Sequence, residues 1–487
     1  MTNKQWFNDI TEHRTGLSKV LEDDTIKAVK DLITNKYSEK AHFIYELIQN
    51  ADDAKATRIS FKLKEDGLEF IHNGTERFTL SNPESKIEDK ENGAFGHINA
   101  ITSIALSTKT KSDKIGKFGI GFKSVFRYTN TPHIYDEIYQ FKIKDYIIPI
   151  QLSKGIKPQK NKTIFWFPFD KEEIKPKQAY KEILSKFKNL RETLLFLNHV
   201  NIMSWESIRD KGEQVFKLNI STKYKNIKVD YISSKIEINK DVKTNFYYKF
   251  SKQVPRKKEL FDSVIFNYDK QKKEIIPKKA NAYCFFETKH ITNLNFIINA
   301  PFELNDNREQ LMYSDEQDDW NVKRLSSLAK LTTESINILS TKIKEVKIDH
   351  TILNIIPLSP IDQNTGSLPF SMFYDEILLG FKTNKILNTS DGKNIDNTTA
   401  YWTEDKELIK LFPDNLLSEV LKRDTASFVF SKLLDTKEID SNKCKYVREV
   451  VDKQITAKVL LKNISTVFTE KRDDKWLLQL YKYLQKK

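Results

Sequence analysis

Apolar and polar residues in the first 205 positions repeat with the periods of both helices and strands. The segment HFIYELIQNADDA repeats its apolar residues every three to four positions, as a helix does, and residues 20–56 look helical as a whole. ATRISFKL and LEFIH carry strand patterns, and the turn KEDG between them predicts a hairpin. A short helical piece is predicted at HINAITSIA, and strands at EIYQFKIKDYIIPI and KTIFWFPF. We therefore expect a two-layer α/β sandwich with a largely antiparallel sheet.

The pattern changes in the second half of the chain. Residues 213–300 alternate repeatedly and predict a strand-rich unit, and residues 320–347 predict one long helix. The polar stretch IIPLSPIDQNTGSLP then marks a boundary near 350–370. Further helices are expected at residues 371–380, 404–424, 441–463 and at the final WLLQLYKYLQKK. The predicted fold class is α+β, with three domains: a two-layer α/β sandwich at 1–205, an α/β middle domain at 206–350, and a mixed, mainly helical region at 351–487.

Composition and charge limit the class of protein. The chain has 487 residues, 39% of them hydrophobic and 11% aromatic, which is typical of a globular protein. Its formal net charge of +14 would attract polyanions, although a solubilising lysine-rich surface is the simpler explanation. Cys284 and Cys444 form no disulfide framework or metal-ligand spacing. With no apolar signal core and no stretch long enough to span a membrane, we expect a cytoplasmic protein without a membrane partner.

Three polar residues share one face of the first strong helix. Glu46, Asn50 and Asp53 are spaced by four and then three positions. An Asn oxygen can bind Mg²⁺, and a Glu one turn away can orient and deprotonate a water molecule. The alternative is a solvated polar helix face.

Asn73 and Gly74 directly follow the strand LEFIH. They suit a simple turn. In the other interpretation, the Asn73 side chain accepts a hydrogen bond from an adenine amino group, and Gly74 permits close approach.

Three glycines lie within six positions in GKFGIGFKSVF, which spans residues 116–126. Backbone N–H groups without side-chain shielding, at the start of a helix, can bind phosphate. Lys109, Lys111 and Lys114 lie just upstream and can add positive charge. A glycine turn with only a structural role is the alternative, and the run lacks the Gly-Lys-Ser/Thr ending of a P-loop.

Taken together and in this order, these motifs resemble the GHKL ATPase superfamily, which includes gyrase, large heat-shock chaperones, histidine kinases and MutL. Glu46 to Ala54 reads E-x-x-x-N-x-x-D-A, and Gly116 to Phe122 reads G-x-x-G-x-G-F. The continuation KSVFR is most similar to the sacsin-type, chaperone-like branch, and Thr163 matches the usual threonine of the sheet. The resemblance covers roughly residues 20–170. It implies a Bergerat ATP-binding fold with ATP and Mg²⁺ as cofactors and residues 75–115 as a lid.

The resemblance also implies roles for single residues. Glu46 would be the catalytic base, and Asn50 would bind both the metal and the nucleotide. Asn73 stands where the superfamily has an adenine-reading aspartate, so an uncharged amide would have to accept that hydrogen bond. The other nucleotide contacts would be Asp53, Ala54, Gly74, Lys109, Lys111, Gly116, Phe118, Gly119, Ile120, Gly121, Phe122 and Thr163.

A second catalytic candidate lies far downstream. Arg308 in INAPFELNDNRE is similar to the arginine that the middle domain of chaperone-like members directs at the γ-phosphate, where it would offset charge during phosphoryl transfer. A surface pair with Asp306 or Glu309 is the alternative.

Three classes of function remain open from the sequence. The first is a slow, Mg²⁺-dependent ATPase that switches conformation, dimerises when its lid closes and acts on client proteins. The second is a nucleic-acid clamp or defence ATPase, suggested by the net charge and by lysines interleaved with aromatic residues in KFSKQVPRKKELFDSVIFNYDKQKKEIIPKK. The third is an ATP-gated interaction module of a larger complex. A histidine-kinase role is disfavoured, because no helical phospho-acceptor histidine segment precedes the motifs.

Overall fold

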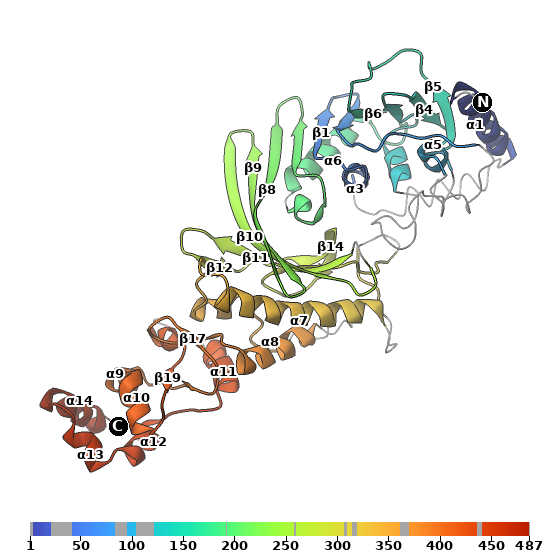
Figure 1. Cartoon of the computed structure of the whole chain (residues 1–487). Coiled ribbons are helices and arrows are strands. Elements are labelled where there is room, and N and C mark those ends of the chain that lie inside the picture. The colour runs from blue at the N-terminus through green and yellow to red at the C-terminus, as the bar shows by residue number, and fades with distance from the viewer. Residues whose placement is uncertain are drawn as a thin grey trace.

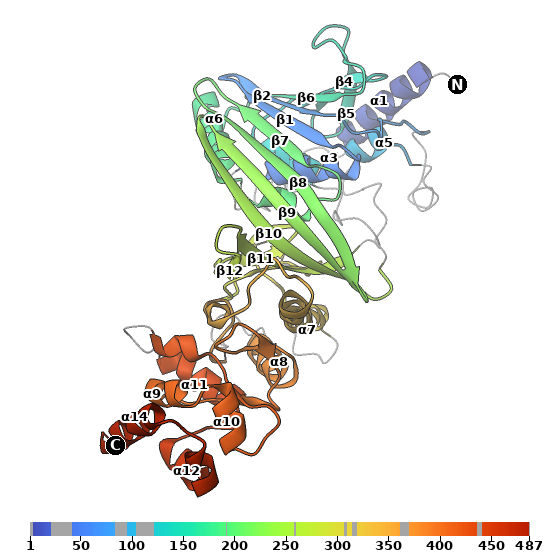
Figure 2. The same cartoon turned by 60° about the vertical axis from the view of Figure 1, so that its left-hand side comes forward.

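The computed structural model has a mixed α/β fold dominated by one large sheet. It describes residues 3–20, 41–82, 95–103, 121–190, 192–257, 260–305, 309–313, 319–360, 370–435 and 441–486. Within these residues, fifteen strands form a single sheet in which parallel and antiparallel pairs both occur. The molecule is elongated. The N-terminal elements and the C-terminal helices lie at opposite ends, and the long strands of the sheet lie between them (Figures 1 and 2).

The N-terminal end of the sheet is antiparallel, as the sequence predicts. Its strands are β1 (Arg58–Leu63), β2 (Gly67–His72), β6 (Thr163–Pro168), β3 (His133–Tyr135), β4 (Gln140–Lys144) and β5 (Ile148–Gln151), in that spatial order. The helical elements are α1 (Asn3–Val20), α3 (Phe43–Asp53), α5 (His97–Ile101), η1 (Phe122–Arg127) and α6 (Pro176–Asn189). Aromatic rings join the helices to the strands: Phe61 of β1 contacts Phe70 of β2 and Phe187 of α6, with ring centroids 4.7 and 5.0 Å apart. The apolar faces of both kinds of element therefore share one core.

The sheet continues without a break across the predicted boundary at residue 205. Strand β7 (Ile202–Glu206) pairs parallel to β1 on one side and antiparallel to β8 on the other. The remaining strands are β8 (Lys211–Tyr224), β9 (Ile227–Ile238), β10 (Asp241–Gln253), β11 (Phe261–Asp269), β12 (Glu274–Ile276), β13 (Asn281–Cys284), β14 (Phe286–Ile291) and β15 (Ile297–Asn299). Hydrogen bonds of the β7 backbone thus connect the N-terminal and middle parts of the chain directly.

Helices form the rest of the structure. The long helix α7 (Trp320–Thr341) lies against strands β10 and β11, and α8 (Ser371–Thr383) packs on α7. Asp319 caps α7 by accepting a hydrogen bond from the Val322 N–H. The smaller elements that follow are β16 (Leu387–Asn388), β17 (Asn394–Ile395), β18 (Ala400–Tyr401), α9 (Lys406–Leu411), α10 (Asp414–Val420), β19 (Ser427–Phe428), α11 (Ser441–Val450), α12 (Ala457–Asn463), α13 (Thr466–Glu470) and α14 (Asp474–Gln485). Short 3₁₀ turns are η2 (Thr193–Phe196), η3 (His350–Asn354) and η4 (Ser431–Asp435).

The predicted elements within the described residues are mostly present. Residues 404–424 and 441–463 each contain two helices. Residues 21–40 of the expected helical stretch 20–56 lie outside the described part of the chain. Two larger differences occur in the N-terminal part. The helix expected after the glycine cluster is only a six-residue 3₁₀ turn, η1, in which Ser124 N–H donates to Gly121 O and Tyr128 N–H donates to Val125 O. Helix α1 was not expected at all. No helix in the described parts of the chain is long and apolar enough to cross a membrane.

Candidate functional site

Helix α3 carries the first predicted motif and forms the centre of the candidate site. Ile44, Leu47 and Ala51 are buried in the N-terminal core. Glu46 is also buried, with only 4% of its surface exposed, while Asn50 is partly exposed. The alternative of a fully solvated polar face is therefore wrong for Glu46. A buried carboxylate is costly unless nearby groups compensate for it.

The first and third motifs meet where Glu46 contacts Gly121. A Cβ atom built on Gly121 would overlap the Glu46 carboxylate and lie 2.7 Å from its Cδ. The next residue, Phe122, is buried and its ring lies 6.0 Å from that of Phe165 in β6. Glycine at 121 therefore allows the end of the glycine cluster to lie directly on the predicted catalytic carboxylate.

The C-terminal end of α3 contacts the turn after β2. A Cβ atom on Gly74 would lie 2.7 Å from the Ala54 carbonyl oxygen, and that oxygen accepts a hydrogen bond from Thr75 N–H at 2.9 Å. Asp53, partly buried, is the residue before Ala54. The two predicted motifs are therefore adjacent here, and the lack of a side chain at 74 is needed for chain packing.

Asn73 makes the contacts of a structural turn. Its Oδ1 accepts hydrogen bonds from the N–H groups of Thr57 and Arg58, at 2.9 and 2.8 Å. Its Nδ2 donates to Thr57 Oγ1 at 2.9 Å. Both lone pairs of the amide oxygen thus have partners within the protein, which favours the turn interpretation over adenine recognition.

Thr163 lies opposite His72 in the sheet and belongs to a buried polar network. Its hydroxyl donates to Asp136 Oδ1 at 2.8 Å. Arg77 Nη1 lies 3.3 Å from Asp136 Oδ1 and 3.3 Å from Thr163 Oγ1. Burial, and then the charge of Arg77, lower the pKa of His72 to about 4. The neutral His72 ring accepts a hydrogen bond from Gly74 N–H at Nδ1, which links the network to the turn after β2.

Sequence reasoning missed Asp52, which is almost completely buried. Its carboxylate accepts hydrogen bonds from the N–H groups of Asn198, His199 and Val200, at 3.0, 2.7 and 2.9 Å. Asp52 follows the buried Ile48 by four positions, so the helical spacing alone could have identified it as buried. It fastens α3 to the segment that leads into β7.

Lys123 was also missed, although it directly follows the glycine motif. It is buried in η1, and its ammonium group donates to the carbonyl oxygens of Ile101 and Tyr146. Burial, and then the charge of Arg14, lower the pKa of Lys123 to about 7. A buried lysine of this kind, next to a predicted phosphate-binding motif, is a candidate functional group.

Several predicted site residues lie outside the described part of the chain. They are Lys109, Lys111, Lys114, Gly116, Phe118, Gly119, Ile120 and Arg308. Among the described residues, no group of three or more His, Cys, Asp or Glu side chains could hold a metal ion by itself. A metal site that uses Asn50 would therefore need ligands from bound phosphate or water.

Comparisons with known proteins find similarity over part of the chain. Residues 22–145 match the family model described as "Sacsin domain". "Protein NO VEIN" of Arabidopsis thaliana is 38% identical over 117 residues, which are 24% of this chain and 4% of that protein. Human "Sacsin" is 32% identical over 142 residues, which are 26% of this chain and 3% of that protein. The sacsin resemblance is thus confirmed for this segment, but the chain matches only a small fraction of either relative.

One solved structure has a distant likeness over a longer stretch. It is described as "Crystal Structure of N terminal domain of a DNA repair protein" and covers 63% of this chain and 98% of its own. The identity is 9% and the TM-score is 0.33, values too low to support an argument about function.

Proposed function

We propose that this chain binds ATP with Mg²⁺ and hydrolyses it slowly, as a conformational switch of the sacsin and GHKL type. The contact between Glu46 and Gly121 carries the proposal. Two motifs separated by about seventy positions in the sequence meet at one buried carboxylate. Packing alone does not require an acidic side chain at such a position, whereas activation of a water molecule does.

The residues around this contact fit a magnesium nucleotide. Asn50 lies one turn after Glu46 on α3 and has an amide oxygen of the kind that Mg²⁺ accepts. Bound Mg²⁺ would neutralise charge on the phosphates. The Glu46 carboxylate would orient the attacking water and take its proton, and the protein surrounding Glu46 would exclude other water molecules.

The same proposal assigns roles to residues outside the described ranges. The glycine run would donate backbone N–H groups to the phosphates, and Lys109 and Lys111 would add positive charge. Arg308 would stabilise charge on the transferred phosphoryl group. We expect closure over the nucleotide to drive dimerisation and, through it, the action on a client protein.

Titration calorimetry with ATP, with and without Mg²⁺, tests the proposal together with an assay of phosphate release. We expect binding that Mg²⁺ strengthens and slow turnover that Glu46→Gln removes. A folded chain that neither binds ATP nor releases phosphate would overturn the proposal.

A polyanion clamp is the second candidate, because exposed lysines occur along the β8–β10 ribbon. Lys223 and Lys225 are exposed at the turn between β8 and β9, and Lys217 is exposed in the middle of β8. Lys243 is exposed near the start of β10, level with the part of β8 that pairs with β7. Such a group of charges could contact nucleic-acid phosphates. Binding to single-stranded or duplex DNA that weakens steeply with added salt would support this candidate. Replacing the four lysines with glutamine should then reduce the salt dependence.

A further inference from the structure

An aromatic pair connects the helix that carries Glu46 to the middle part of the sheet. Tyr45, the residue before Glu46, lies against Phe286 of β14, with ring centroids 4.6 Å apart. The Lys186 ammonium of α6 lies 3.7 Å from the centroid of the Tyr45 ring. Both aromatic side chains pack against the N-terminal core, although Phe286 belongs to a strand more than two hundred residues further along the chain.

The backbone holds Phe286 in this position with local strain. The preceding residue, Phe285, has a φ of +65° in the tight turn between β13 and β14. A bulky residue rarely adopts this left-handed conformation. The buried Asn299 side chain supports the turn, because its Oδ1 accepts a hydrogen bond from Phe285 N–H at 2.7 Å.

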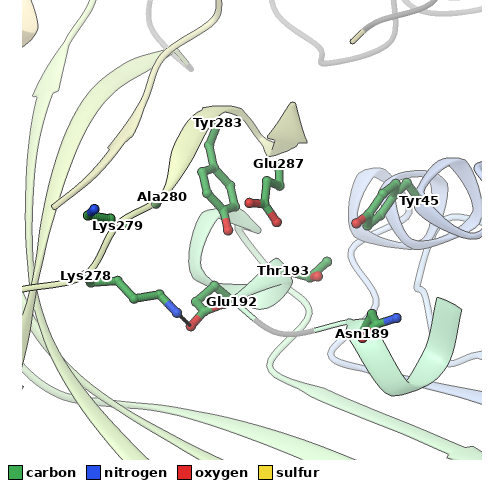
Figure 3. Close-up of a pocket in the computed structure, with 9 residues that line it drawn as sticks. All are labelled: Tyr45, Asn189, Glu192, Thr193, Lys278, Lys279, Ala280, Tyr283 and Glu287. Carbon is green, nitrogen blue, oxygen red and sulfur yellow. Dashed lines mark ion pairs between the residues drawn. The ribbon is translucent and has the colours of Figure 1, made fainter. Parts of the chain in front are cut away.

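The ring pair lies beside a polar cavity. The cavity has a volume of about 180 Å³. Figure 3 shows Tyr45 on one side of it and Tyr283 of β13 and Glu287 of β14 on another. Across it, Lys278 forms an ion pair with Glu192 at 3.2 Å. Because this space is lined mainly by polar groups, it offers little apolar packing between α3 and the middle strands. The Tyr45–Phe286 pair is therefore well placed to transmit movement between them.

The other end of α3 is fastened to the segment that leads into the middle sheet. Asp52 accepts three backbone N–H groups from residues 198–200, directly before β7. Glu46 thus lies between two attachments of the same helix, one at Tyr45 and one at Asp52. A shift of the middle strands would move α3 as a unit and change the position of the Glu46 carboxylate.

We infer that Phe286 is a positioning residue, which acts through Tyr45 to set where α3 holds the Glu46 carboxylate. The inference rests on the proposed ATPase function and extends it. In this arrangement the middle sheet regulates hydrolysis, because its contact with α3 determines whether the base is aligned with the attacking water. Misalignment of a catalytic group slows the chemical step more than it weakens binding.

Phe286→Ala, Phe286→Tyr and Tyr45→Ala test the inference in the full chain. We expect Phe286→Ala and Tyr45→Ala each to slow single-turnover ATP hydrolysis about tenfold, while the Kd for ATP changes less than twofold. Phe286→Tyr keeps an aromatic ring and should retain the normal rate. The matched control is Phe261→Ala, because Phe261 is a partly exposed ring of β11 in the same sheet. An unchanged rate in Phe286→Ala would overturn the inference, as would an equal loss in the control.

Hydrogen exchange of the α3 amides separates this inference from the proposed function. If the parent chain proves not to hydrolyse ATP, the proposed function fails. Hydrogen exchange without nucleotide would still test whether the Tyr45–Phe286 contact stabilises α3. Loss of either ring should speed exchange in residues 43–53, and the double variant should add little to the single ones. Additive effects, or exchange that does not change, would show that Phe286 does not act through Tyr45.

Discussion

The carboxylate of Glu46 lies directly against the backbone of Gly121, and this contact leaves no room for a side chain at position 121. It joins an acidic helix to the last glycine of a glycine-rich run. Neither residue is conspicuous alone, because glutamate is common in helices and glycine is common in turns. Their contact explains why both are needed and makes each one open to a specific test.

Gly121→Ala should displace the Glu46 carboxylate and reduce ATP hydrolysis by at least about tenfold. The added methyl group would overlap the carboxylate, and the side chain would have to rotate away from its position. Steady-state phosphate release measures the effect. Gly16→Ala is the matched control, because a Cβ atom at Gly16 of α1 meets no atom within 4 Å. Full activity of Gly121→Ala would mean that the contact has no catalytic importance.

Glu46→Gln should bind ATP normally and lose hydrolysis by about 10²–10⁴-fold, the usual range for removal of a general base. Glutamine has nearly the same shape, so packing against Gly121 is retained while the proton acceptor is lost. Calorimetry gives the binding and a single-turnover assay gives the rate. Normal turnover would eliminate Glu46 as the base.

Asn50→Ala should weaken ATP binding in the presence of Mg²⁺ and leave binding in EDTA unchanged. The amide is proposed as a metal ligand, so its effect should depend on the metal. Paired calorimetric titrations with and without Mg²⁺ measure the difference. An equal change under both conditions would point to general damage to α3.

Periodicity predicted most elements of the fold, but it could not predict their long-range pairing. The parallel contact between β1 and β7 joins residues about 140 positions apart, and no local pattern specifies it. Helix α1 was missed because its sequence has few apolar residues. It is held by tertiary contacts, such as Phe7 on Phe141 at 5.8 Å and Thr11 Oγ1 on the Pro149 carbonyl. These contacts are absent from any short window of sequence.

The candidate site was predictable as a set of motifs, and less so in its details. The order of the motifs predicted one site between the Glu46 helix and the glycine run, and the structure brings Glu46 and Gly121 into contact. The burial of Glu46 depends on a segment that follows it by about seventy residues, so helical spacing could not show it. The role of Asn73 depends on Thr57 and Arg58, whose N–H groups donate to it from the neighbouring strand of the hairpin. Side-chain partners of this kind require the folded chain.

Asp52→Ala should lower the free energy of unfolding by about 3 kcal/mol. Three backbone N–H groups would lose a charged acceptor, and buried donors without partners are costly. Denaturant unfolding measures the loss, and Glu65→Ala in the exposed turn between β1 and β2 is the control. A loss no larger than that of the control would show that these hydrogen bonds contribute little.

Lys123 should make the protein more stable as the pH rises from 7 to about 9.5. The pKa of Lys123 is lowered to about 7 in the folded chain, while an unfolded lysine keeps its ordinary value of 10.5. Between these two values the unfolded chain binds more protons, so the free energy of unfolding increases with pH. One such group contributes up to about 1.4 kcal/mol per pH unit. Burial also lowers the pKa of Lys249, to about 8, and it contributes with the same sign over the upper part of this range.

Lys123→Met separates the two lysines. The variant removes the charge and keeps a long apolar stem. Its free energy of unfolding should therefore increase less between pH 7 and 9.5, because the contribution of Lys123 is lost. The Lys249 part should remain. The upper limit of 9.5 matters because the pKa of Tyr128 is raised in the folded chain, which lowers stability only above about pH 10. Denaturant unfolding at four or five pH values gives the slope of the free energy of unfolding against pH, for the parent chain and for Lys123→Met. Equal slopes for the parent and Lys123→Met would mean that Lys123 remains charged throughout, held by the carbonyl oxygens of Ile101 and Tyr146 despite its burial.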